Sequence, residues 1–64
     1  MANQTKFELY RDVKKQYRWR LIAGNGEIVA TSESYTELSS AKRSAERVGE
    51  IAHSAIITHH ENLS

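Results

Sequence analysis

The dipeptide Asn25-Gly26 constrains the fold of this chain more than any other feature of its 64 residues. Segments rich in aromatic and β-branched residues lie on both sides of it. Both residues tolerate positive φ, and an Asn-Gly pair between two such segments is typical of a two-residue type I′ turn. We therefore expect residues 16–35 to form a β-hairpin in which Gly24 pairs with Glu27.

Side-chain alternation divides this hairpin into two faces, because successive side chains of a strand point to opposite sides of the sheet. The ring of Trp19 supplies the largest apolar area, so its face is expected to be the core face. The opposite face would set Arg18 across from Glu33 as an ion pair. The predicted core face comprises Tyr17, Trp19, Leu21, Ala23, Ile28 and Ala30, and the solvent face comprises Arg18, Arg20, Ile22, Val29, Thr31 and Glu33.

A further strand is expected over residues 6–12, where apolar and polar side chains alternate. Matching its apolar phase to that of the hairpin fixes the register between the two strands. Residues 13–15 would form the connecting loop, which completes a three-stranded antiparallel meander. The predicted pairs are Phe7 with Leu21, Glu8 with Arg20, Leu9 with Trp19 and Tyr10 with Arg18.

After residue 34, apolar residues recur at steps of three and four instead of two, which predicts an amphipathic helix. Ser34 or Thr36 is expected to cap its N-terminus. The apolar stripe is narrow and mostly alanine, so the helix would lie close to the sheet and bury a modest area. The stripe comprises Leu38, Ala41, Ala45, Val48 and Ala52.

After the helix, residues 55–60 are apolar and β-branched enough to form a fourth strand. The predicted fold is therefore α+β, an antiparallel meander with one helix packed on the sheet and a C-terminal strand. We expect residues 1–64 to form a single domain, and residues 1–5 and 62–64 to be flexible.

The short length of the chain favours self-association. A domain of this size buries only about 60% of the surface that its unfolded chain exposes, and there is no cysteine to form a disulfide. Oligomerisation is the remaining common source of additional stability.

No apolar run approaches the ~20 residues of a membrane span, and residues 1–6 lack the apolar segment of a signal peptide. We therefore expect a cytoplasmic location.

Four short segments of the chain are distinctive in combination. They are FELY at residues 7–10, YRWRL at 17–21, NGEI at 25–28 and ATSE at 30–33, followed by Tyr35. Together they resemble the YegP-like family of small proteins. The resemblance extends from Phe7 to about Val48. It departs from the family pattern in the helix, where this chain has Arg43-Ser44-Ala45 in place of the small polar residue, glycine and branched apolar residue that the family often carries.

The resemblance implies a β(3)-α-β unit, which in this family occurs as tandem repeats or as homodimers that exchange their C-terminal strands. This chain has one such unit. The resemblance therefore implies a homodimer in which the last strand crosses to the sheet of the other subunit. That strand would comprise Ala55, Ile56, Ile57, Thr58, His59 and His60.

Catalytic and metal-binding motifs are not evident in the sequence. His59 and His60 would point to opposite faces of a strand, so they are poorly placed to share one metal ion with each other or with His53. No serine stands in a recognisable arrangement with a histidine and an acid, and Gly24-Asn25-Gly26 lacks the lysine of a phosphate loop. We expect no enzyme activity, no metal and no cofactor.

Two classes of function remain, a protein-interaction or structural module and a weak nucleic-acid binder. The net charge of +1 gives no strong overall attraction to nucleic acid, although the first twenty residues are positive. We expect a homodimeric interaction or structural module whose protein partner is unidentified. The alternative is weak, sequence-independent nucleic-acid binding, because aromatic and basic side chains on a sheet can stack bases and neutralise phosphates. The residues of this face, for either nucleic acid or a protein partner, are Tyr10, Lys14, Lys15, Arg18 and Arg20.

Overall fold

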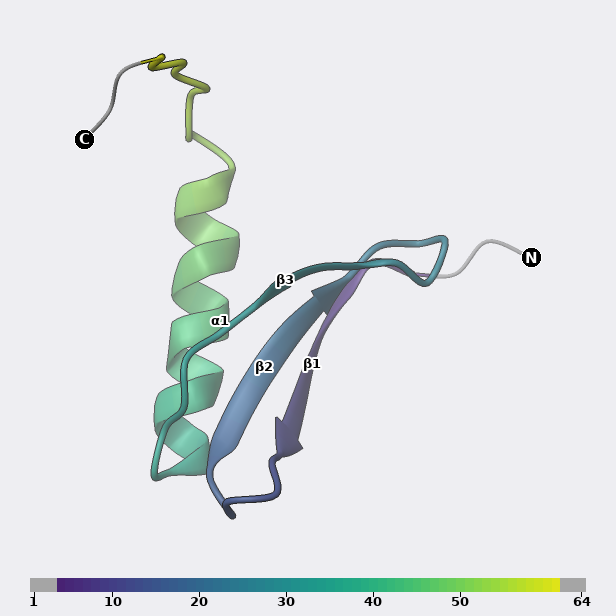
Figure 1. Ribbon diagram of the computed structural model, residues 1–64, viewed down its shortest axis with the longest axis vertical. Coiled ribbons are helices and arrows are strands. Elements are labelled where there is room, and N and C mark those ends of the chain that lie inside the picture. The colour runs from purple at the N-terminus through teal and green to yellow at the C-terminus, as the bar shows by residue number, and fades with distance from the viewer. Residues whose placement is uncertain (1–3, 62–64) are drawn as a thin grey trace.

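Three antiparallel strands followed by one helix make up the described part of the chain, residues 4–61, in this computed structural model. The strands form one sheet in the order β1-β2-β3, and α1 packs against one face of it (Figure 1). This arrangement confirms the α+β class and the meander. The elements are β1 (Lys6–Arg11), β2 (Tyr17–Ile22), β3 (Ile28–Thr31) and α1 (Leu38–Ala52).

The register between β1 and β2 is the predicted one. The alternation of apolar residues determines it, since a shift by one residue would move every apolar side chain to the solvent face. The observed pairs include Phe7 with Leu21, Glu8 with Arg20, Leu9 with Trp19 and Tyr10 with Arg18.

Ala23 and Glu27 close the hairpin between β2 and β3, so its loop consists of the three residues 24–26 and the predicted two-residue type I′ turn is wrong. The N–H of Ala23 donates to the carbonyl of Glu27 at 2.8 Å, and the N–H of Gly26 donates to the carbonyl of Ala23 at 2.9 Å. Only Gly26 has positive φ in this loop, at 90°, whereas a type I′ turn needs it at both central residues. The side chain of Asn25 instead accepts the N–H of Glu27 at 3.0 Å.

An irregularity in β3 compensates for the additional loop residue. Ile22 pairs with Ile28, whereas Leu21 pairs with Ala30, so Val29 is an extra residue at a β-bulge. Beyond the bulge the pairing returns to the predicted register. The bulge leaves Ile28 51% exposed and Val29 53% exposed, so the placement of Ile28 in the core was wrong.

Trp19 is the centre of the core. Its side chain is 6% exposed, and the ring of Phe7 packs edge-on against it with 5.1 Å between the ring centroids. The helix presents Ala41 and Ala45 toward the sheet, and these residues are 0% and 5% exposed. The predicted core position of the tryptophan and the predicted central part of the alanine stripe are confirmed.

The hydroxyl of Ser44 joins the helix to two aromatic residues. The indole Nε1–H of Trp19 donates to Ser44 Oγ at 3.0 Å, and the phenol of Tyr35 donates to the same oxygen at 2.9 Å. A buried indole N–H needs an acceptor, because leaving it unpaired costs about 1–3 kcal/mol. Tyr35 is itself tied to the sheet by two backbone hydrogen bonds with Tyr17.

The N-terminal cap of α1 and the segment that follows the helix differ from expectation. Glu37 is the N-cap residue, and its side chain makes no capping hydrogen bond, so the predicted cap by Ser34 or Thr36 is wrong. After the helix, residues 55–60 are exposed and have no regular structure in the single chain (Figure 1). The predicted fourth strand is therefore not formed within one chain, because residues 55–60 pair with none of the three described strands.

Two other expectations concern the ends of the chain and the membrane. The expectation of flexible ends falls mainly on residues 1–3 and 62–64, which lie outside the described residues. Residues 4 and 5 precede β1 and are exposed. Among the described residues, no helix is long and apolar enough to cross a membrane.

Gly49→Ala is expected to stabilise the protein. The glycine lies inside α1, and a Cβ at this position would meet Phe7 Cε2 at 3.5 Å, an ordinary van der Waals distance. Glycine within a helix is about 0.5–1 kcal/mol less favourable than alanine. Urea unfolding followed by circular dichroism should show a higher midpoint for the variant. A lower midpoint would mean that Phe7 leaves no space for the methyl group.

Candidate functional site

The face of the sheet opposite the helix carries the predicted aromatic and basic residues. Arg20 donates through Nε to Glu8 Oε1 at 2.6 Å, and its guanidinium lies 4.9 Å from the centre of the Tyr10 ring. The Arg20 side chain is thus held between a carboxylate and an aromatic ring. Both of these contacts compete with any external ligand for the arginine.

Arg18 contacts Asp12 and Ser34, and the predicted ion pair with Glu33 is absent. Its Nε lies 3.3 Å from Asp12 Oδ2, and Nε and Nη2 donate to Ser34 Oγ at 3.3 and 3.1 Å. The prediction failed because β3 ends at Thr31, before regular pairing reaches residue 33.

Asp12 organises the turn between β1 and β2. Its Oδ1 accepts the backbone N–H groups of Lys14 at 2.9 Å and Gln16 at 3.0 Å, and its carbonyl accepts the N–H of Lys15 at 2.9 Å. Lys15 adopts positive φ, 63°. Aspartate commonly stabilises a turn by bonding backbone groups a few residues ahead. Sequence reasoning missed this role, although an aspartate two residues before a lysine pair in a loop was a usable signal.

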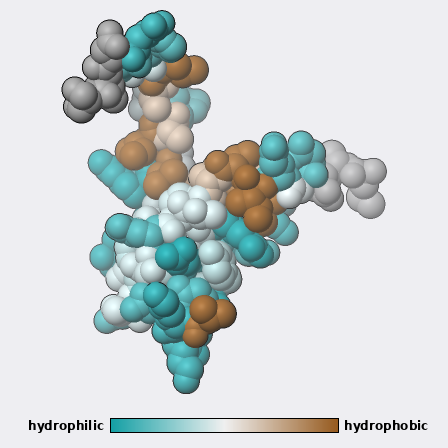
Figure 2. Space-filling model, viewed as in Figure 1, coloured by the Kyte–Doolittle hydropathy of each residue, from teal (hydrophilic) through white to brown (hydrophobic). Residues whose placement is uncertain are grey.

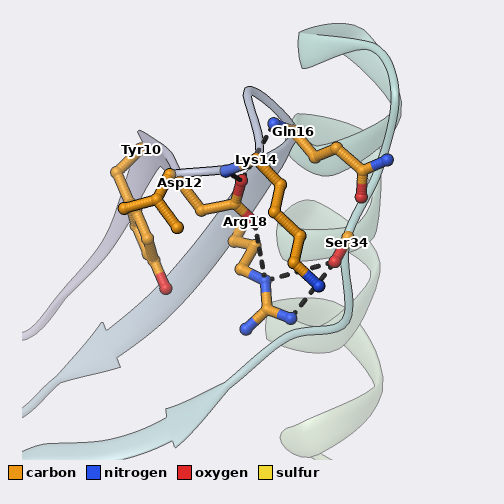
Figure 3. Close-up of a pocket in the computed structure, with 7 residues that line it drawn as sticks. Tyr10, Asp12, Lys14, Gln16, Arg18 and Ser34 are labelled. Atoms are coloured by element: carbon orange, nitrogen blue, oxygen red, sulfur yellow. Dashed lines mark hydrogen bonds and ion pairs between the residues drawn. The ribbon is translucent and has the colours of Figure 1, made fainter.

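An open pocket of about 310 Å³ lies between this turn and the segment after β3. Figure 3 shows the Asp12 carboxylate and the Arg18 guanidinium at its wall, with the Lys14 side chain extending over the same opening. Of the five predicted face residues, three line the pocket, while Arg20 stacks on Tyr10 and Lys15 belongs to the turn. The polar lining comprises Tyr10, Asp12, Lys14, Gln16, Arg18 and Ser34.

The histidines do not meet in a metal site. Within residues 4–61, no group of three or more His, Cys, Asp or Glu side chains is placed to hold a metal ion. His59 Nε2 lies 3.3 Å from Glu61 Oε1, and both side chains are 82% exposed. This exposed pair has none of the further ligands that a zinc site requires.

Residues 55–60, the C-terminal segment, carry two highly exposed aliphatic side chains. Ile56 is 84% exposed and Ile57 is 97% exposed. Ile51 on the helix and Ile28 on β3 are also about half exposed. Figure 2 shows apolar surface on the helix, near its C-terminal end and on the neighbouring arm of the sheet. The described chain therefore leaves several large aliphatic side chains in solvent.

Comparison with known proteins identifies the family. A domain of unknown function (DUF1508) matches residues 12–58. The chain is 60% identical over 30 residues to a UPF0339 protein of Neisseria meningitidis serogroup B, covering 47% of this chain and 54% of that protein. It is 42% identical over 43 residues to a UPF0339 protein of Agrobacterium fabrum, covering 67% and 69%.

The similarity extends to YegP and to a solved structure. UPF0339 protein YegP of Escherichia coli is 49% identical over 37 residues, covering 58% of this chain and 34% of YegP. The solution structure of a protein from Haloferax volcanii superposes with a TM-score of 0.78 at 36% identity, covering 91% of this chain and 98% of that one. The chain spans about half the length of the Neisseria relative that it matches. These matches confirm the resemblance seen in the sequence, and the chain belongs to the UPF0339 (DUF1508, YegP-like) family.

Proposed function

We propose that this protein is a small interaction module that forms a homodimer by adding its C-terminal segment to the sheet of a second copy. The observation that carries the proposal is the exposure of Ile56 and Ile57, at 84% and 97%. Burying a large aliphatic side chain contributes about 1.5–3 kcal/mol. Adjacent side chains of an added strand point to opposite faces, so at least one of the two isoleucines would lie on the helix-covered face of the sheet, and its burial provides a driving force for association.

The sheet offers free edges to receive such a segment. β1 and β3 are the outer strands of the described sheet, so one side of each has unpaired backbone N–H and C=O groups. An extended peptide can add to such an edge, with backbone hydrogen bonds giving affinity and alternate side chains giving specificity. β3 is the more suitable edge, because Ile28 and Val29 expose apolar area there.

The small core gives a further reason for association. Only Trp19, Ala41 and Ala45 are buried apolar residues in the described chain. Two of these three are alanines, which contribute little area. Domains of this size without disulfides or metal commonly gain stability from a partner subunit.

The proposal includes no catalytic step. Within residues 4–61, the side-chain hydrogen bonds of serine join it to backbone groups, an arginine or aromatic residues, and none joins a serine to a histidine. The serines concerned are Ser32, Ser34, Ser44 and Ser54. A nucleophile activated by an adjacent base would need such a contact.

Weak nucleic-acid binding remains the alternative function, but the geometry favours it less. Arg20 contacts the Glu8 carboxylate and already lies over the Tyr10 ring. Trp19, the best ring for stacking a base, is buried. Affinity for labelled single-stranded DNA or RNA that falls steeply with salt and is lost in Arg18→Ala/Arg20→Ala would support the alternative.

Sedimentation equilibrium at micromolar concentration tests the dimer. The 7.3 kDa chain is expected to sediment with twice its monomer mass. The double variant Ile56→Asp/Ile57→Asp should be monomeric, because a charge buried in the interface is costly. Val13→Asp is the matched control, since Val13 is 99% exposed and lies at the β1–β2 turn. A monomer mass for the unmodified chain, or an unchanged dimer in the double variant, would contradict the proposal.

A further inference from the structure

We propose that the pocket beside the β1–β2 turn binds the phosphate group of a small molecule. The inference is independent of the dimer, because it rests on a different part of the molecule. The pocket has a volume of about 310 Å³, at the lower end of the range for small-molecule sites. Its lining combines two cationic side chains, one carboxylate and several neutral polar groups.

The Arg18 guanidinium is held in a fixed position before any ligand arrives. Asp12 contacts its Nε, and Ser34 accepts hydrogen bonds from Nε and Nη2. Within residues 4–61, Nη1 makes no hydrogen bond or ion pair, and the side chain is 37% exposed. Arg18 therefore presents remaining donors to the pocket from a planar fork that suits phosphate oxygens. Because its neighbours already restrict its rotamers, binding would cost little further entropy.

The carboxylate in the pocket does not cancel the positive charge. Asp12 Oδ1 is occupied by the N–H groups of Lys14 and Gln16, and Oδ2 faces Arg18. In the part of the chain that the structure describes, no carboxylate lies within 4 Å of the Lys14 ammonium. Two cations against one anion leave the pocket with one net positive charge, which favours an anionic ligand.

The two cations approach the opening from different elements. Lys14 belongs to the turn after β1 and Arg18 to β2, and Figure 3 shows both side chains directed over the same opening. A phosphate has enough oxygens to accept from the guanidinium fork and from a separate ammonium together. Gln16 and Tyr10 add further polar groups to the lining.

A single phosphate suits this site better than a nucleic-acid strand does. Sequence-independent binding of a strand requires a basic groove that follows several phosphates. Beside the pocket, Arg20 is paired with Glu8, and that carboxylate would repel the next phosphate along a strand. The favourable charge is confined to one concavity.

A titration of the ¹⁵N-labelled protein with inorganic phosphate, followed by amide chemical shifts at constant ionic strength, tests the proposal. The amides of Lys14, Gln16 and Ser34 are expected to shift and saturate. For a five-atom ligand held by charge-assisted contacts, we expect a dissociation constant of about 1–10 mM. Sodium chloride at equal ionic strength should produce no saturable shift.

Two variants distinguish a specific phosphate site from general attraction between the protein and an anion. Lys14→Ala should weaken phosphate binding by about five- to tenfold, the loss of one exposed charge-assisted hydrogen bond. Lys42→Ala removes the same charge from an exposed position on α1 and should leave affinity unchanged. The amide spectra of both variants report whether each remains folded. Equal weakening in the two variants, or no saturable shift in the unmodified protein, would overturn the proposal.

The type of ligand is tested with two further probes. Glycerol phosphate should bind at least as well as inorganic phosphate, because the pocket is open enough for a small substituent. A thymidine oligonucleotide has only diester phosphates and should bind no better per phosphate. Saturation by the oligonucleotide alone would overturn the proposal in favour of strand binding.

Discussion

Trp19→Ala is expected to lower the free energy of unfolding by about 3–5 kcal/mol, the usual cost of truncating a buried aromatic side chain. The tryptophan is 6% exposed and contacts the Phe7 ring. Its removal would also leave Ser44 without the indole donor. Small domains have only about 5–15 kcal/mol of stability in total, so much of the variant population should be unfolded at moderate temperature.

Urea unfolding followed by far-UV circular dichroism measures this effect, at one fixed protein concentration because dimerisation would add to stability. Val13→Ala is the control, since Val13 is 99% exposed and such surface changes usually stay within about 0.5 kcal/mol. An unchanged midpoint for Trp19→Ala would show that the ring contributes nothing to the core.

Ala41→Leu is expected to destabilise the protein by about 1–3 kcal/mol, because larger side chains in a well-packed core force displacement of their neighbours. Ala41 is 0% exposed and lies on the face of α1 that meets the sheet. Ala52→Leu makes the same substitution at an exposed position of the same helix and should have little effect. Thermal unfolding of the two variants in parallel measures the difference. Similar melting temperatures would mean that the helix can move away from the sheet at little cost.

The parts of the fold that depend on side-chain alternation were predictable from the sequence. Only one phase puts Leu9 and Trp19 on the same side of the sheet, and this phase also pairs Glu8 with Arg20. The position of Trp19 against the alanine stripe followed from the same argument. These features have strong local signals because a one-residue slip would expose the whole apolar face.

The turn and the bulge were not predictable in this way. An Asn-Gly pair is compatible with a two-residue loop and with a three-residue loop that has glycine in the left-handed region. The extra residue in the loop shifts the pairing by one position, and the extra residue Val29 at the bulge shifts it back. Leu21 therefore pairs with Ala30 whether the loop has two or three residues. Alternation beyond the bulge therefore contains no information about the length of the loop.

The pocket was predictable in part. Tyr10 and Arg18 were placed on one face by alternation, and Lys14 was placed in the adjoining loop. The contributions of Asp12 and Ser34 were missed, because each depends on backbone geometry outside the regular strands. The ion pair expected between Arg18 and Glu33 assumed that β3 continues two residues further than it does.

Ser44 has a consequence for how α1 is oriented. A helix face made of alanine has no protruding side chains to interlock with a sheet, so apolar contact alone would allow α1 to rotate about its axis or slide along it. The Ser44 oxygen accepts hydrogen bonds from Trp19 on β2 and from Tyr35 on the segment after β3. Hydrogen bonds weaken steeply when their angles are distorted. The two donors therefore restrict both the rotation and the translation of the helix, and one hydroxyl group supplies the directional specificity that the alanine stripe lacks.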